Sequence, residues 1–123
     1  MGIRALSEEI GEPYELIQTT TDRLKIRPVE QIKINPNGWV PVLSWDDGAM
    51  YECAAITMFL CDRHPKAKLA PKLEAPERSL FLQTLLYFAS SVQIAFKSDY
   101  HLHRFADKPE AERSARRRGH RRL

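Results

Sequence analysis

Two neighbouring residues, Glu52 and Cys53, carry the side chains best suited to chemistry in this 123-residue chain. They precede an apolar stripe formed by Ile56, Phe59 and Leu60, whose spacing predicts a helix that starts near Glu52. A helix start presents backbone N–H groups and the positive end of the helix dipole, which together suit a bound carboxylate. The same field could lower the pKa of the Cys53 thiol and make it nucleophilic.

Each of these interpretations has a simpler alternative. Glu52 could do no more than stabilise the start of its own helix, and Cys53 could be a small packing residue. Cys61 lies eight residues after Cys53 on the same predicted helix, about two turns away, so the two thiols cannot form a disulfide. Because unpaired thiols are typical of reducing compartments, the sequence predicts a cytoplasmic protein.

The segment before this helix must position Glu52 and Cys53. Pro28 suits the first turn of a short helix, and Asn35-Pro36 ends that helix, because the residue before a proline is disfavoured in the α region. Residues 40–44 predict a strand that contains Pro41. Asp47-Gly48 then predicts a two-residue hairpin turn before a return strand over residues 49–51.

The stretches 35–43 (Asn-Pro-Asn-Gly-Trp-Val-Pro-Val-Leu), 46–48 (Asp-Asp-Gly) and 52–56 (Glu-Cys-Ala-Ala-Ile) together resemble the N-terminal domain of the glutathione transferases. The resemblance covers most of residues 2–100. It implies an α/β, thioredoxin-like fold followed by the start of an all-α domain. In this interpretation residues 1–65 form the glutathione-binding domain, residues 66–73 a linker, and residues 74–123 the first helices of the second domain, with a long helix over 74–98.

The resemblance also implies a glutathione site. In the family the Val-Pro bond, here Val40–Pro41, is cis, and the backbone beside it pairs with the cysteinyl part of glutathione. Glu52 and Cys53 stand where the family holds the γ-glutamyl end, with a thiol in place of the usual hydroxyl. Trp39 stands where many members carry a basic residue near the glycyl carboxylate. Its indole N–H can donate one hydrogen bond but carries no charge, and an interface or core aromatic is the alternative.

The N-terminal residues predict a helix over 1–10, with Ile3, Leu6 and Ile10 on one face and Gly11 as its end, followed by a strand over residues 14–18. In the family, a first strand and a loop with the catalytic Tyr, Ser or Cys come before this helix. The resemblance therefore implies that the chain lacks this strand and is truncated at both ends. We assign no catalytic residue.

The net charge of +3 is unevenly distributed, since residues 104–123 hold eight Arg or Lys and only three Asp or Glu. No Phe, Tyr or Trp interleaves the arginines of residues 113–122, so a solvated helix face is favoured over nucleic-acid binding. His101 and His103 could share a strand face, but no third ligand is apparent, and we expect no metal. No stretch approaches a membrane span, and no signal sequence is visible, so no membrane partner is expected.

The sequence thus predicts a glutathione transferase-like protein. The family reaction is attack of the glutathione thiolate on an electrophilic small molecule, with glutathione as co-substrate and a homodimer as the usual assembly. The chain itself is expected to be inactive, because the activating residue is missing. Two alternatives remain open: a non-enzymatic interaction module, and a thiol-dependent redox protein using Cys53, against which the lack of a C-x-x-C motif counts.

Overall fold

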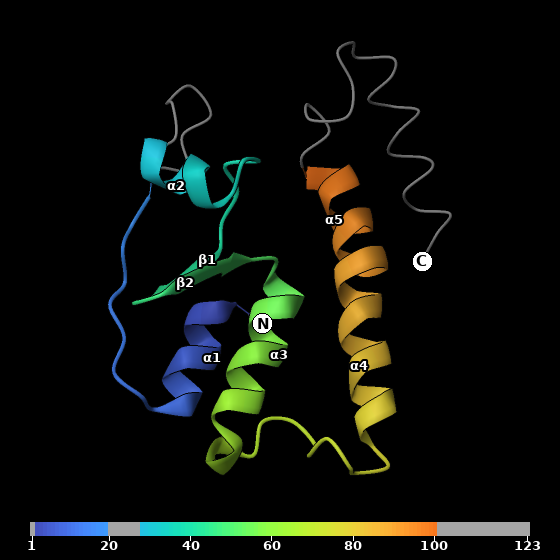
Figure 1. The fold of residues 1–123 in the computed structure, drawn as a ribbon. Helices are drawn as coiled ribbons and strands as arrows, with labels where there is room; N and C mark the ends of the chain where they lie inside the picture. Colours follow the sequence, from blue (N-terminus) through green and yellow to red (C-terminus); the bar gives the residue numbers. More distant parts are fainter. Residues whose placement is uncertain (1, 20–27, 101–123) are drawn as a thin grey trace. The chain divides into compact units, whose positions relative to one another are not determined.

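The computed structural model of the chain describes residues 2–19 and 28–100 (Figure 1). Its elements in chain order are α1 (Ile3–Ile10), α2 (Val29–Ile34), β1 (Val42–Trp45), β2 (Gly48–Tyr51), α3 (Cys53–Arg63), the 3₁₀ turn η1 (Pro65–Ala67), α4 (Arg78–Tyr87), the π-helical segment η2 (Phe88–Val92) and α5 (Gln93–Tyr100). Two compact units are present, one ending at Ala75 and one starting at Pro76. The bounds of the predicted domains and linker stay a prediction. The basic residues 104–123, for which a solvated helix face is predicted, lie outside the described residues.

The first helix, α1, ends where the sequence predicts. Gly11 adopts a left-handed conformation with a φ of 76°, which a glycine accepts without steric cost, and its N–H bonds to the Ser7 carbonyl at 3.1 Å. Leu6, one of the three residues expected on the apolar face, is buried. The helix lies alongside α3 in the first unit.

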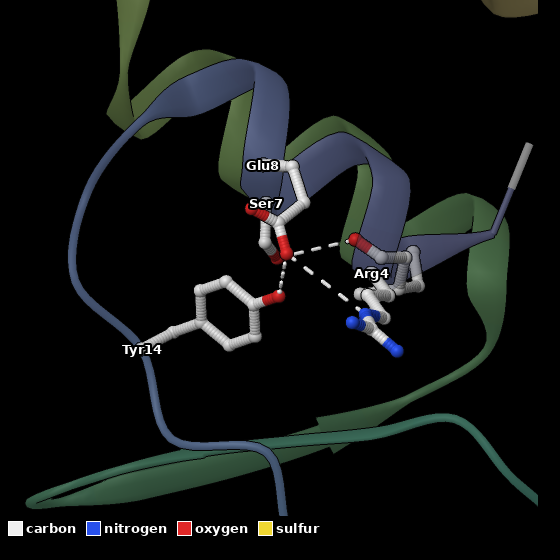
Figure 2. Close-up of polar contacts among 5 residues, drawn as sticks. Arg4, Ser7, Glu8 and Tyr14 are labelled. Atoms are coloured by element: carbon white, nitrogen blue, oxygen red, sulfur yellow. Dashed lines mark hydrogen bonds and ion pairs between the residues drawn. The ribbon is translucent and has the colours of Figure 1, made fainter.

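The predicted strand over residues 14–18 is wrong. These residues form an extended coil, and Tyr14, Leu16 and Ile17 are 44%, 50% and 74% exposed. A strand needs a neighbour to bond its N–H and C=O groups, and within residues 2–19 and 28–100 only β1 and β2 pair. The coil is instead tied to α1, where the Tyr14 hydroxyl donates to Glu8 Oε1 at 2.6 Å (Figure 2).

The predicted hairpin is present with its turn moved by one residue. Strands β1 and β2 pair antiparallel from Val42 opposite Tyr51 to Trp45 opposite Gly48, so the turn is Asp46-Asp47 and not Asp47-Gly48. A Cβ on Gly48 would clash with Cζ2 of the Trp45 indole ring, so the ring packs over this position only because the residue is a glycine. Strand β1 starts after Pro41 because a proline nitrogen cannot donate to a ladder.

Helix α3 provides most of the core of the first unit. It buries Ala54, Ile56 and Cys61, and the Ile56 side chain is fully buried. The Phe59 ring stacks on Trp45 of β1 with the ring centroids 4.9 Å apart. This stack fixes α3 against the end of the hairpin.

The second unit contains a helical run from Arg78 to Tyr100, which starts later than the predicted 74–98 and leaves Pro76 outside its first turn. Leu80 and Phe88, which helical spacing would place on a covered face, are 62% and 57% exposed. The stretch Arg78–Lys97 has a mean hydropathy of 1.4 and is long and apolar enough to cross a membrane. A core helix of a soluble protein can have the same length and composition, so the absence of a membrane partner stays a prediction.

Candidate functional site

The register of the hairpin brings two predicted site segments to the same end of the sheet. Val42 and Tyr51 form the last pair of the ladder. The residues next to them, Pro41 and Glu52, therefore leave the ladder at the same end. Since paired strands lie about 4.8 Å apart, segments 40–41 and 52–53 stay close although they come from different parts of the motif.

Glu52 adopts an unusual backbone conformation at this position. Its φ of 76° and ψ of 111° lie in a region that residues other than glycine rarely occupy, at a cost of about 1–3 kcal/mol. Its carbonyl accepts the first hydrogen bond of α3, from the Ile56 N–H at 2.9 Å. The Glu52 side chain is exposed and makes no capping hydrogen bond to the helix. Its carboxylate thus lies at the helix start without a capping role that would explain it.

Cys53 is the first residue of α3 and is half-buried. Burial raises the pKa of the Cys53 thiol, and the charge of the adjacent Glu52 carboxylate raises it further. The Thr57 hydroxyl donates to the Cys53 carbonyl at 2.8 Å and braces the first turn. A raised pKa disfavours the reactive thiolate, so the structure supports Cys53 as a small packing residue. Cys61 is buried within the same helix.

The loop that leads into β1 carries the other predicted residues. The Val40–Pro41 peptide bond is cis, the isomer that the resemblance implies. The side chains of Trp39 and Val40 are 45% and 50% exposed. Backbone groups at Val40 therefore lie in an accessible loop, next to the start of α3.

Two further residues, Gln31 and Asn35 of the α2 region, hold this loop. Asn35 is 3% exposed, and its Nδ2 donates to the Trp39 carbonyl at 3.0 Å. Gln31 Nε2 donates to the Gly38 carbonyl at 3.1 Å. The sequence signalled Asn35 only as a helix end and gave no signal for Gln31, because a glutamine is an ordinary residue on a helix surface.

The described residues contain no group of three or more His, Cys, Asp or Glu side chains that could hold a metal ion. His101 and His103 lie outside these residues. What the site offers instead is an accessible backbone segment beside a helix N-terminus. Such an arrangement can pair with an extended, peptide-like ligand and hold a carboxylate at the end of it.

The element order and geometry define a class: a thioredoxin-like domain followed by a helical part. A solved structure described as a ternary complex of BphK, a bacterial GST, matches 94% of this chain with a TM-score of 0.71 and 29% identity. A sphingomonad glutathione S-transferase complexed with glutathione matches 88% of this chain with a TM-score of 0.66 and 28% identity. The chain has the glutathione S-transferase fold.

This chain matches only part of each of the two solved structures. This chain covers 57% of the BphK chain and 53% of the sphingomonad chain, so it spans little more than half of their length. No family model matches the chain, and no curated protein is similar to it at a significant level.

Proposed function

We propose that this chain binds glutathione at the end of the hairpin, as the glutathione-binding part of a glutathione transferase-like protein. The observation that carries the proposal is the register of β1 and β2, which delivers Val40-Pro41 and Glu52-Cys53 to the same end of the sheet. The two similar structures support it, since both are described as glutathione S-transferases and one as complexed with glutathione.

Each part of glutathione has a matching group. The backbone at Val40 pairs with the cysteinyl part, which is itself a peptide. The γ-glutamyl end carries an ammonium and a carboxylate; the Glu52 carboxylate suits the ammonium, and the N-terminus of α3 suits the carboxylate. Trp39 lies next to Val40, is 45% exposed and provides an aromatic surface for the glycyl end.

In this proposal the reaction is attack of the glutathione thiolate on an electrophilic small molecule, carried out by a cytoplasmic homodimer. Val40 and Glu52, together with the N-terminus of α3 at Cys53, bind and orient glutathione. None of the described residues is assigned as the group that activates its thiol.

A calorimetric titration with glutathione tests the proposal. We expect Glu52→Ala to weaken binding by about 1–3 kcal/mol, roughly 5- to 150-fold, because it removes a charged hydrogen-bond acceptor. Glu9→Ala, which removes an exposed carboxylate from α1, is the matched control and should bind as the unmodified chain does. Equal binding by all three proteins would contradict the site, and a chain that fails to bind glutathione would favour an interaction module.

The redox alternative is tested by alkylation of Cys53 with iodoacetamide. Because the pKa of this thiol is raised, the folded chain holds less thiolate at neutral pH than the urea-unfolded chain, and we expect slower alkylation. The alkylation rate should rise at a higher pH in the folded chain than in the unfolded chain. Cys53→Ser reports the contribution of Cys61. Faster alkylation of the folded chain at neutral pH would favour the redox protein.

A further inference from the structure

The side chain of Gln31 joins three segments of the first unit. Its Nε2 donates to the Gly38 carbonyl at 3.1 Å and lies 3.4 Å from the Trp39 carbonyl. Its Oε1 accepts from the Thr19 hydroxyl at 2.6 Å. Two carbonyl groups can only accept hydrogen bonds, so the amide NH₂ must face them and the amide oxygen must face Thr19. Every hydrogen-bonding end of Gln31 thus has a defined partner.

The Trp39 carbonyl receives donors from two side chains, since Asn35 Nδ2 also binds it, at 3.0 Å. A carbonyl oxygen has two lone pairs, so this group is fully occupied. The Asn35 side chain is itself fixed, because its Oδ1 accepts the Asn37 N–H at 3.1 Å and it is 3% exposed. Gln31 and Asn35, which belong to the α2 region, therefore determine the direction in which the Trp39 carbonyl points.

This direction determines where the next N–H points. Among the described residues, the cis peptide bond is the one between Val40 and Pro41, so the peptide between Trp39 and Val40 is trans. In a planar trans peptide the C=O and N–H groups point in opposite directions. With the Trp39 carbonyl held toward Asn35 and Gln31, the Val40 N–H points away from these two side chains.

We propose that Gln31 is a positioning residue for the glutathione site, acting with Asn35 to orient the Trp39–Val40 peptide that meets the ligand. This inference rests on the proposed function. In this inference Gln31 does not contact glutathione. Its amide NH₂ holds the Trp39 carbonyl and so orients the Val40 N–H, and the Thr19 hydroxyl keeps the amide group from rotating.

Three variants separate this role from simple loop stabilisation. Gln31→Glu keeps the size of the side chain and an oxygen for Thr19, but places a carboxylate oxygen against two carbonyl groups. Gln31→Met has a similar length and removes all the hydrogen bonds. Thr19→Val removes only the hydroxyl. We expect glutathione affinity to fall about tenfold in both Gln31 variants and less than about threefold in Thr19→Val.

Backbone ¹⁵N NMR provides a readout in the free protein. In the Gln31 variants we expect shifted resonances and greater mobility at the Val40 amide, with little change in Thr19→Val. Urea unfolding of the same proteins measures stability, and affinity should not follow the unfolding midpoint across the three variants. If Gln31→Glu does not fold, Gln31→Met provides the comparison.

The outcomes distinguish this inference from the function on which it rests. If the unmodified chain shows no titration shifts with glutathione, the proposed function is wrong, whatever Gln31 does. If it binds glutathione and both Gln31 variants bind equally well, or if the Val40 amide is unchanged in them, the positioning role is wrong. Affinity losses that match the stability losses in all three variants would also overturn it.

Discussion

Residues 12–19 and the hairpin of residues 42–51 have similar strand-favouring sequences but different structures. In the hairpin, two residues of turn bring β1 and β2 together, so each strand supplies the partner of the other. The coil around Tyr14 and Ile17 has no neighbouring strand among the described residues, and its apolar side chains are exposed. The difference shows that strand propensity reflects pairing and packing more than a preference of the backbone.

The largest expected effect tests how unequally the two regions contribute to stability. Ile56→Ala should destabilise the chain by about 2–5 kcal/mol, because it leaves a cavity where a fully buried side chain was. Ile17→Ala is the matched control, and with a side chain 74% exposed it should change stability by less than about 0.5 kcal/mol. Urea unfolding followed by circular dichroism measures both. Comparable losses would show that the coil is packed as tightly as α3.

A second variant tests the cross-strand pair at the turn. Gly48→Ala places a Cβ against the Trp45 indole ring, which is stacked on Phe59, and should cost about 1–3 kcal/mol. In a Trp45→Ala background the same substitution should cost much less, because the ring is gone. A double-mutant cycle of unfolding free energies gives the difference. A penalty of equal size in both backgrounds would mean that the Trp45 ring is not what requires a glycine.

A third variant tests whether the positive φ of Glu52, the residue after the hairpin, lowers the stability of the fold. Glu52→Gly should raise the unfolding free energy by about 1 kcal/mol, since glycine accepts a φ of 76° with little strain. It should also weaken glutathione binding, because the carboxylate is lost. Ala49→Gly, in the middle of β2, is the control and should lower stability. A less stable Glu52→Gly protein would contradict this account of Glu52.

The smallest effect concerns the contact that holds the coil. The hydrogen bond from Tyr14 to the Glu8 carboxylate raises the pKa of Tyr14 (Figure 2). Glu8→Gln should lower that pKa toward its ordinary value, whereas Glu9→Gln, the next carboxylate on α1, should not. An NMR titration with ¹³C-labelled tyrosine rings resolves Tyr14.

The contact between Tyr14 and Glu8 also makes the stability of the fold depend on pH, because it raises the pKa of Tyr14. The pKa of Tyr14 is higher in the folded chain than in the unfolded chain. The contact with Glu8 therefore stabilises the fold at a pH below the ordinary tyrosine pKa, and this stabilisation is lost as the pH rises through the raised pKa of the folded chain. A pKa of Tyr14 that is the same in the Glu8→Gln protein would show that the coil is held in another way.

Sequence patterns predicted the elements whose signals are local. Gly11 ends α1 and Asn35 ends α2 as expected, since these ends depend on the residues at the end itself. The hairpin turn was misplaced because the role of Gly48 depends on Trp45 across the sheet. The strand over residues 14–18 failed for a similar reason, since its formation depends on a neighbour.

The candidate site also contains residues that the sequence predicted and a residue that it did not. The motif placed Val40 and Glu52 in one site, and the register of the hairpin brings them to one end. Gln31 was missed because its partners are backbone carbonyls seven and eight residues away, which no side-chain pattern reveals. Residues that act on backbone groups have no recurring spacing in the sequence, so they are found only once the loop has a conformation.

The π-helical segment η2 also affects how the second unit tolerates changes in chain length. A π turn holds one residue more than an α turn, so it resembles a single-residue insertion that the helix has absorbed. The Ser90 hydroxyl bonds the Leu86 carbonyl at 2.8 Å and so satisfies a backbone group at the irregular turn. Loss of one residue between Phe88 and Val92 would convert the segment to a regular α-helix and leave the faces of α4 and α5 in the same phase. The helix can therefore gain or lose one residue at this position while the side chains of α4 and α5 keep their faces.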